Sequence, residues 1–284
     1  MTVVIVTDSS ARLPAAIRER YRIEQVPMHV LTADRDLLED VDDIGPEIFN
    51  DPQTTTSGVT PADLEVAYEK AIEASDGDGV VAVHLSRRFS GTWGSARLAA
   101  EKFQGRIRVV DSRTVGLGVG FAAIAAAQTA ESGADMDRVY ESAIRVGSTT
   151  ECLLCVQQLE NLRSSGRIGA TTRLFASALA IKPILRVVDG SLVLKEKQRT
   201  MSKAIAKMIE TAVDVAQRRP VTLGVQHCEA PELAAEITEA LRSKLTIESL
   251  VESDLGPVLS RHVGSGAVGI ALTTSLDPID LTPR

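Results

Sequence analysis

Short apolar runs rich in β-branched residues alternate with helical patterns through the first half of the chain, and this alternation constrains the fold most. Residues 3–7, 23–31, 79–85 and 107–110 are such runs. Between them, residues 61–75 form the clearest helical pattern, with apolar side chains at i, i+3, i+4, i+7 and i+8 after the helix-starting Pro61. Strands and helices that alternate in this way predict an α/β fold with a largely parallel sheet and helices on both faces.

The pattern changes near residue 150. Asp189-Gly190 joins two extended runs and is a favoured type I′ hairpin turn. Helical patterns follow the change at 159–165, 172–181, 201–218 and 231–244, and a glycine-rich segment follows at 255–267. Because no long linker interrupts the chain, we expect two closely packed α/β domains. The predicted N-terminal domain spans residues 1–150, and a smaller C-terminal domain spans residues 151–284.

Composition argues against several classes of protein. The net charge of −7 disfavours nucleic acid binding, which requires an excess of Lys and Arg. No apolar run approaches the length of a membrane span, and the N-terminus lacks a secretory signal, so we expect a cytoplasmic protein with at most transient membrane contact. Cys152 and Cys155 lie within an apolar run, which predicts buried thiols. We expect no metal site and no cofactor.

A loop with two hydroxyl side chains is the first candidate for anion binding. The strand-like run at 79–85 continues into Ser90-Gly91-Thr92, which directly precedes a helical pattern. Hydroxyl groups and free backbone N–H groups at the first turn of a helix are well placed to hold an anion. The alternative is that Ser90 or Thr92 only caps the helix.

Two further segments add polar groups. Thr56 and Ser57 belong to a hydroxyl cluster before the helix at residue 61, and the same two interpretations apply to them. His262 precedes Gly264 in the glycine-rich segment, where the glycine permits close backbone approach and the imidazole could donate to an oxyanion. A structural histidine is the alternative.

Two arginines lie in predicted turns near glycine or proline residues. Arg167 follows Gly166, and Arg199 follows the predicted hairpin. Guanidinium groups in such turns suit a phosphate or a partner that carries carboxylates. Solvated loop charges are the alternative.

The order of these short motifs resembles the DegV family, the fatty-acid-binding subunits of bacterial fatty acid kinase. The resemblance covers nearly the whole chain. It rests on Val4-Ile5-Val6-Thr7-Asp8-Ser9-Ser10, Thr56-Ser57, Ser90-Gly91-Thr92, Val110-Asp111-Ser112, Gly166-Arg167-Ile168, Lys182-Pro183-Ile184-Leu185, Arg199-Thr200 and the segment from His262 to Ala267. Two segments depart from the usual pattern: Gly58-Val59-Thr60 replaces Gln-Pro-Ser, and Ser265 replaces a proline.

The resemblance implies a protein that holds a long-chain fatty acid between or within its two domains. It implies that Thr56, Ser90 and His262 surround the carboxylate. It also implies that Arg167 and Arg199 lie near the mouth of the channel, where a separate ATP-dependent kinase converts the bound acid to an acyl phosphate. On this basis the chain is a carrier without catalytic machinery of its own.

Two enzyme classes are alternatives. A serine hydrolase would use Ser90 and His262, with Asp111 or Asp8 as the orienting carboxylate, but the chain has no G-x-S-x-G nucleophile elbow. A nucleotide-binding enzyme would use the glycines at 116–120, but Phe121 takes the place of the final glycine and no phosphate-binding P-loop motif is present.

Overall fold

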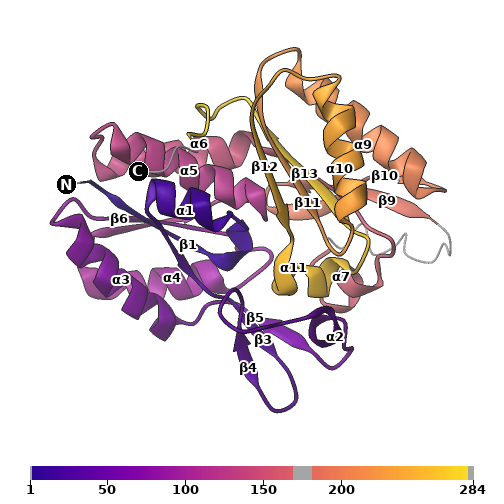
Figure 1. Cartoon of the computed structure of the whole chain (residues 1–284). Helices are drawn as coiled ribbons and strands as arrows, with labels where there is room; N and C mark the ends of the chain where they lie inside the picture. The colour runs from indigo at the N-terminus through magenta and orange to yellow at the C-terminus, as the bar shows by residue number, and fades with distance from the viewer. Residues whose placement is uncertain (1, 169–180, 281–284) are drawn as a thin grey trace.

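The structure, a computed structural model, describes residues 2–168 and 181–280 (Figure 1). One large sheet has the order β2-β1-β6-β7 and is parallel throughout. Its strands are β1 (Val4–Asp8), β2 (Ile23–Val26), β6 (Val80–His84) and β7 (Ile107–Asp111). The predicted parallel sheet is therefore confirmed. The helix predicted at 172–181 falls outside the described residues, apart from its last position.

Helices cover both faces of this sheet, as predicted (Figure 1). On one face lie α3 (Pro61–Ser75) and α4 (Thr92–Ala100), which continues into the 3-10 turn η2 (Glu101–Phe103). On the other lie α1 (Ala15–Tyr21), α5 (Leu117–Glu131) and α6 (Met136–Thr149). Helix α3 begins with a capping box, in which the side chains of Thr60 and Asp63 each accept a hydrogen bond from the other residue's backbone N–H.

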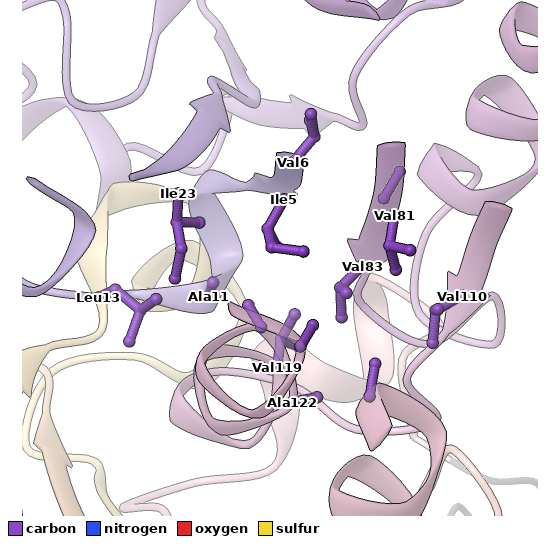
Figure 2. Close-up of a cluster of buried hydrophobic side chains, with 14 of the residues drawn as sticks. Ile5, Val6, Ala11, Leu13, Ile23, Val81, Val83, Val110, Val119 and Ala122 are labelled. Atoms are coloured by element: carbon purple, nitrogen blue, oxygen red, sulfur yellow. The ribbon is translucent and has the colours of Figure 1, made fainter. Parts of the chain in front are cut away.

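Helix α5 lies between the two large sheets. It contacts β1 and β6 of the parallel sheet and two strands of the second sheet. Twelve of its fifteen residues are buried, as expected for a helix that is apolar all round. Figure 2 shows Val119 and Ala122 of α5 beside Ile5, Val81 and Val83 of the parallel strands. This helix joins the cores of the two halves.

The second large sheet is mixed, with the order β10-β9-β8-β13-β11-β12. Its strands are β8 (Glu151–Cys155), β9 (Lys182–Val188), β10 (Ser191–Gln198), β11 (Val221–His227), β12 (Ile247–Asp254) and β13 (Val268–Thr273). Helices α9 (Met201–Ala216) and α10 (Pro231–Arg242) pack against it. The predicted β9–β10 hairpin is confirmed, because Asp189 and Gly190 both have positive φ angles, 49° and 78°.

Short elements complete the fold and correct one expectation. They are η1 (Ser9–Ala11), β3 (His29–Leu31), β4 (Asp36–Leu38), α2 (Pro46–Phe49), β5 (Thr55–Ser57), α7 (Glu160–Ser164) and α11 (Gly256–Val263). The single extended run expected at 23–31 is wrong: β2 belongs to the parallel sheet, and β3 to a separate antiparallel sheet with β4 and β5. The glycine-rich segment holds a helix, α11. The division into domains at residue 150 stays a prediction.

Candidate functional site

A cavity lies at the carboxyl ends of the parallel strands. From β1 the chain first adds β2 on one side and later β6 on the other, so the strand order reverses at β1 and β6. Ligands of open α/β sheets bind outside the strand ends at such a switch point. Met28 follows β2, Leu85 follows β6 and Val115 follows β7, and all three line the cavity.

The space between the lining atoms is about 900 Å³, which includes open solvent at the mouth, and the centres of water-sized spheres can occupy about 100 Å³ of it. Helix α11 and strands β8 and β13 form its other walls. Most of the lining is aliphatic, and its apolar side chains are Met28, Leu85, Phe89, Val115, Leu153, Leu154, Leu162, Val187, Leu192, Leu255, Val258, Leu259, Val263, Ile270 and Ala271. We call these residues the apolar wall. A space lined in this way favours a hydrocarbon chain over a polar ligand.

Thr56 and His262 meet in the cavity, although 206 residues separate them in sequence. The distance between Thr56 Oγ1 and His262 Nε2 is 2.8 Å. Burial, together with the positive charges of Arg167 and Arg261, lowers the pKa of His262 to about 4, so the ring is neutral near pH 7. Its Nδ1 atom is buried without a hydrogen-bond partner in the described structure. In either tautomer, the Thr56–His262 pair retains one hydrogen that it can donate to an anion.

Ser90 lines the same cavity as this pair and also bonds to the first residue of α4. Its Oγ accepts the N–H of Thr92 at 3.2 Å and lies 2.9 Å from Thr92 Oγ1. Gly58 makes this packing possible, because a Cβ atom there would be 2.5 Å from both hydroxyl oxygens. Ser90 and Gly58 line the cavity, whereas Thr92 is fully buried and accepts the N–H of Val59. Both interpretations of the Ser90 loop therefore remain compatible with the geometry.

Arg167 supplies a positive charge to the same region. Its Nε donates to the carbonyl oxygen of Phe89 at 3.2 Å, and its Nη1 donates to that of Ser165 at 2.5 Å. These bonds hold the guanidinium beside the Ser90 loop, where it also lines the cavity. We call Thr56, Ser90, Arg167 and His262 the polar end of the cavity.

The remaining predicted site residues do not line the cavity. Ser57 donates to the carbonyl oxygen of Gly58, and Gly91 is exposed at the start of α4. Gly264 ends α11 with a φ of 78°. Arg199 is exposed after β10 and, unlike Arg167, is not part of the cavity lining. The roles expected of these four residues in ligand or kinase binding stay predictions.

The hydrolase alternative requires Ser90, His262 and a carboxylate to contact one another. In the structure each of these groups bonds to a different partner. The Oγ of Ser90 bonds to Thr92, and the ring of His262 bonds to Thr56. Asp8 lies 2.9 Å from the ring of His84 rather than His262. Asp111 accepts the backbone N–H groups of Arg87 and Arg113. The geometry does not assemble the serine, histidine and carboxylate that this alternative needs.

Several cavity residues could not be assigned from sequence. Val258, Leu259 and Val263 line the cavity from α11, a helix hidden by its flanking glycines. Cys152 also lines it, and burial raises the pKa of its thiol to about 11. The i, i+1 and i+5 spacing of the α11 residues would have placed them on one side of a helix, had that helix been recognised.

Neither a membrane-spanning helix nor a metal-binding cluster is found among the described residues. No described helix is both long and apolar enough to cross a bilayer. Across residues 2–168 and 181–280, no group of three or more His, Cys, Asp or Glu side chains is arranged to hold a metal ion.

Comparison with known proteins identifies the family. The family model described as "Uncharacterised protein, DegV family" matches residues 2–275. A DegV domain-containing protein of Mycobacterium tuberculosis is 43% identical over 279 residues, which are 98% of this chain and 99% of the relative. The chain belongs to the DegV family. The resemblance inferred from the short motifs is confirmed.

Solved structures of DegV proteins have the same fold. The fatty-acid-binding DegV family protein of Thermus thermophilus aligns with a TM-score of 0.89 and 29% identity, over 96% of this chain and 99% of that one. DegV of Bacillus subtilis, described as a fatty acid binding protein, aligns with a TM-score of 0.85 and 29% identity over the same shares. The predicted α/β class is confirmed.

Proposed function

We propose that this chain binds a long-chain fatty acid in the cavity. The acyl chain lies along the apolar wall, and the carboxylate lies at the polar end. The observation that carries the proposal is that an aliphatic cavity meets a group of donors that includes a buried, unpartnered imidazole nitrogen. The two DegV relatives described as binding fatty acids support it.

The forces at the two parts of the cavity differ in size. Burial of a sixteen-carbon chain contributes on the order of 12 kcal/mol at about 0.8 kcal/mol per methylene, before the costs of association reduce it. A buried carboxylate costs several kcal/mol unless donors meet it. The hydroxyls of Thr56 and Ser90, the neutral His262 and the guanidinium of Arg167 reduce that cost and fix the direction of the ligand.

We further propose that the chain is a cytoplasmic carrier that presents the acid to a separate ATP-dependent kinase. In that reaction a carboxylate oxygen attacks the γ-phosphorus of ATP, ADP leaves, and an acyl phosphate forms. Arg199 is exposed and outside the cavity, which suits contact with the kinase or the transferred phosphoryl group.

Mass spectrometry of the protein purified from cells tests the binding proposal. Denaturing extraction should release roughly one fatty acid per chain, since an unfilled apolar space loses the contacts that a chain would make. Delipidated protein should then take up palmitate or oleate. A lipid-free extract combined with no uptake of either acid would falsify the proposal.

A reconstituted reaction tests the carrier proposal. The loaded chain, ATP and a purified kinase partner should together yield acyl phosphate, trapped as the hydroxamate. Each component alone should yield none. Formation of acyl phosphate by the loaded chain and ATP without the kinase would overturn the carrier assignment.

A further inference from the structure

Helix α11 brings His262 and part of the apolar wall to the cavity, and its first turn is held from a distant part of the chain. The N–H groups of a first helical turn have no partner within the helix. In α11 the backbone N–H of Val258 donates to Oε1 of Glu39 at 2.8 Å, across 219 residues of sequence. Glu39 follows β4 and is fully buried. A carboxylate from the N-terminal half therefore anchors the helix that carries the imidazole.

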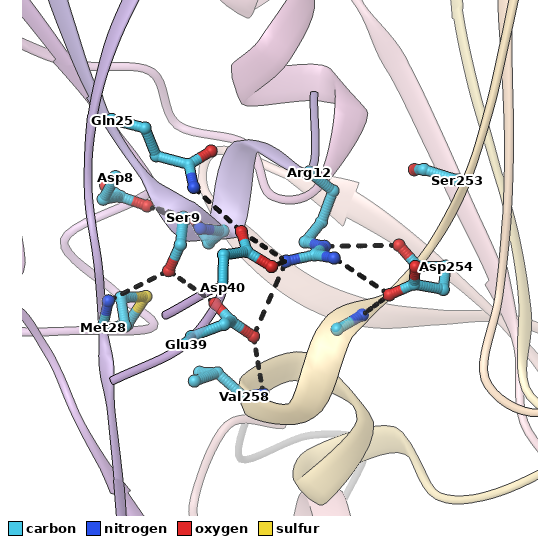
Figure 3. Close-up of polar contacts among 12 residues, drawn as sticks. Asp8, Ser9, Arg12, Gln25, Met28, Glu39, Asp40, Ser253, Asp254 and Val258 are labelled. Carbon is cyan, nitrogen blue, oxygen red and sulfur yellow. Dashed lines mark hydrogen bonds and ion pairs between the residues drawn. The ribbon is translucent and has the colours of Figure 1, made fainter. Parts of the chain in front are cut away.

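Glu39 is also tied to another side of the cavity. Its Oε2 accepts the hydroxyl of Ser9 at 2.5 Å, and that hydroxyl oxygen accepts the backbone N–H of Met28 at 3.0 Å (Figure 3). The N–H of Glu39 donates to the carbonyl oxygen of Met28 at 2.9 Å. Met28 and Val258 both line the cavity. One buried side chain thus joins two cavity walls.

The charge on Glu39 is only partly neutralised. Arg12 Nη1 is 3.8 Å from Glu39 Oε1 but only 3.1 Å from Asp40, and its Nη2 is 2.9 Å from Asp254 (Figure 3). The guanidinium is therefore shared among three carboxylates. Burial raises the pKa of Glu39 to about 7, although Arg12, the Ser9 hydroxyl and the Val258 N–H act in the opposite direction and Asp40 in the same one.

We propose that Glu39 is a positioning residue for the ligand cavity, and that proton uptake by this carboxylate weakens fatty acid binding. The proposal rests on the function proposed above. A neutral carboxyl accepts a weaker hydrogen bond than a carboxylate and loses its attraction to the positive end of α11. Helix α11 then holds His262 and the apolar wall less firmly, and affinity falls by about three- to tenfold as Glu39 becomes protonated.

The test measures affinity at pH 6 and pH 8 with a probe that does not titrate. Hexadecane sulfonate stays ionised over this range, and with a pKa of about 4 His262 stays neutral. Competition against a fluorescent fatty acid gives its dissociation constant. Wild-type affinity should fall by about three- to tenfold from pH 8 to pH 6. Glu39→Gln, which mimics the neutral carboxyl, should show the weaker affinity at both pH values.

Asp40→Asn is the matched control, because Asp40 contacts the same arginine but its contacts do not include α11. It should retain a pH step, with the midpoint moved to lower pH because the Asp40 charge raises the pKa of Glu39. The reciprocal measurement is a carbon-13 titration of Glu39, whose pKa should be lower in the loaded protein than in the empty one. Glu39→Gln should remain folded at pH 8. The raised pKa of Glu39 means that the native state disfavours the carboxylate charge, and the substitution removes that charge.

Distinct outcomes separate this proposal from the proposed function. Absence of uptake of any fatty acid by the wild-type chain at either pH would contradict the proposed function. Normal uptake with no pH step, or with an unchanged step in Glu39→Gln, would overturn the role of Glu39 and leave fatty acid binding intact. A pKa of Glu39 that is equal in the loaded and empty protein would also overturn it.

Discussion

The apolar wall and the polar end belong to one cavity, but they hold a ligand in different ways. The apolar wall is aliphatic and non-directional, so binding strength there scales with the number of methylenes it covers. The polar end consists of two hydroxyls, a neutral imidazole and one arginine, each fixed by named hydrogen bonds. Under the proposed function, the wall supplies affinity and the polar end supplies orientation.

Blocking the apolar wall should give the largest effect. Ala271 lines the cavity from β13 and is nearly fully buried. In Ala271→Phe, a ring that excludes four methylenes should remove about 3 kcal/mol, or about two orders of magnitude in palmitate affinity. Competition binding measures this loss, and thermal unfolding checks the fold, because overpacking costs about 1–3 kcal/mol. Ala271→Val is the graded control and should lose much less. Unchanged palmitate affinity in folded Ala271→Phe would show that the acyl chain does not bind along the apolar wall.

The polar end should make the free energy of unfolding depend on pH, because it contains a titratable imidazole and the apolar wall does not. His262 has a lowered pKa of about 4 in the folded chain, against about 6.5 when unfolded. The unfolded state therefore takes up the proton first, and stability falls as the pH decreases from about 6.5 to about 4. The loss is at most about 3 kcal/mol, and none occurs above this range. Urea unfolding at pH 7.5 and pH 4.5 should show a smaller acid loss in His262→Gln. An equal loss in both proteins would mean that the ring is protonated when folded.

Removing one donor from the polar end should have a smaller effect than blocking the wall. A hydrogen bond to a charged group is worth roughly 1.5–3 kcal/mol, so Ser90→Ala should weaken binding by about one to two orders of magnitude. Ser95→Ala is the matched control, because Ser95 lies in the same helix α4 and does not line the cavity. Isothermal calorimetry with palmitate measures both. Equal affinities would assign Ser90 to helix capping alone.

Arg199 should have the smallest effect on affinity. It is exposed and outside the cavity, so Arg199→Ala should leave palmitate affinity within about threefold, as expected for a surface substitution. The rate of acyl phosphate formation with a kinase partner and ATP should nevertheless fall sharply. Lysine should not fully rescue it, since a point charge cannot make bidentate contacts. Lost binding in Arg199→Ala, with a normal rate for the residual complex, would reverse this assignment.

Local signals allowed much of the fold to be predicted from sequence. Pro61 and Thr60 fix the start of α3, and Asp189-Gly190 fixes the β9–β10 turn, because each depends on neighbouring residues only. The failures have one local cause and one that depends on strand pairing. Helix α11 begins at Gly256-Pro257 and ends at Gly264, residues that also favour loops. The run at 23–31 forms two strands instead of one, because β3 pairs with β4 and β5 instead of joining β2 in the parallel sheet.

The site was predictable in its residue types but not in its contacts. The Ser90 loop lies between a strand and a helix, which sequence alone indicates. The contact between Thr56 and His262 joins two segments 206 residues apart, and no local pattern encodes it. The same holds for Glu39 and Val258, which gave no sequence signal. Thr56, Ser90 and His262 were grouped by family resemblance, and only the fold shows the bonds around them.

The position of β13 has a consequence for biosynthesis. Although β13 is the last strand among the described residues, it lies in the interior of the six-stranded sheet, between β8 and β11. Until it leaves the ribosome, β8 and β11 each lack a partner on one edge, and such edges promote aggregation. The parallel sheet uses only residues up to 111 and can form during synthesis. The second sheet is complete only after residues 268–273 have emerged, so the cavity closes well after the parallel sheet has formed.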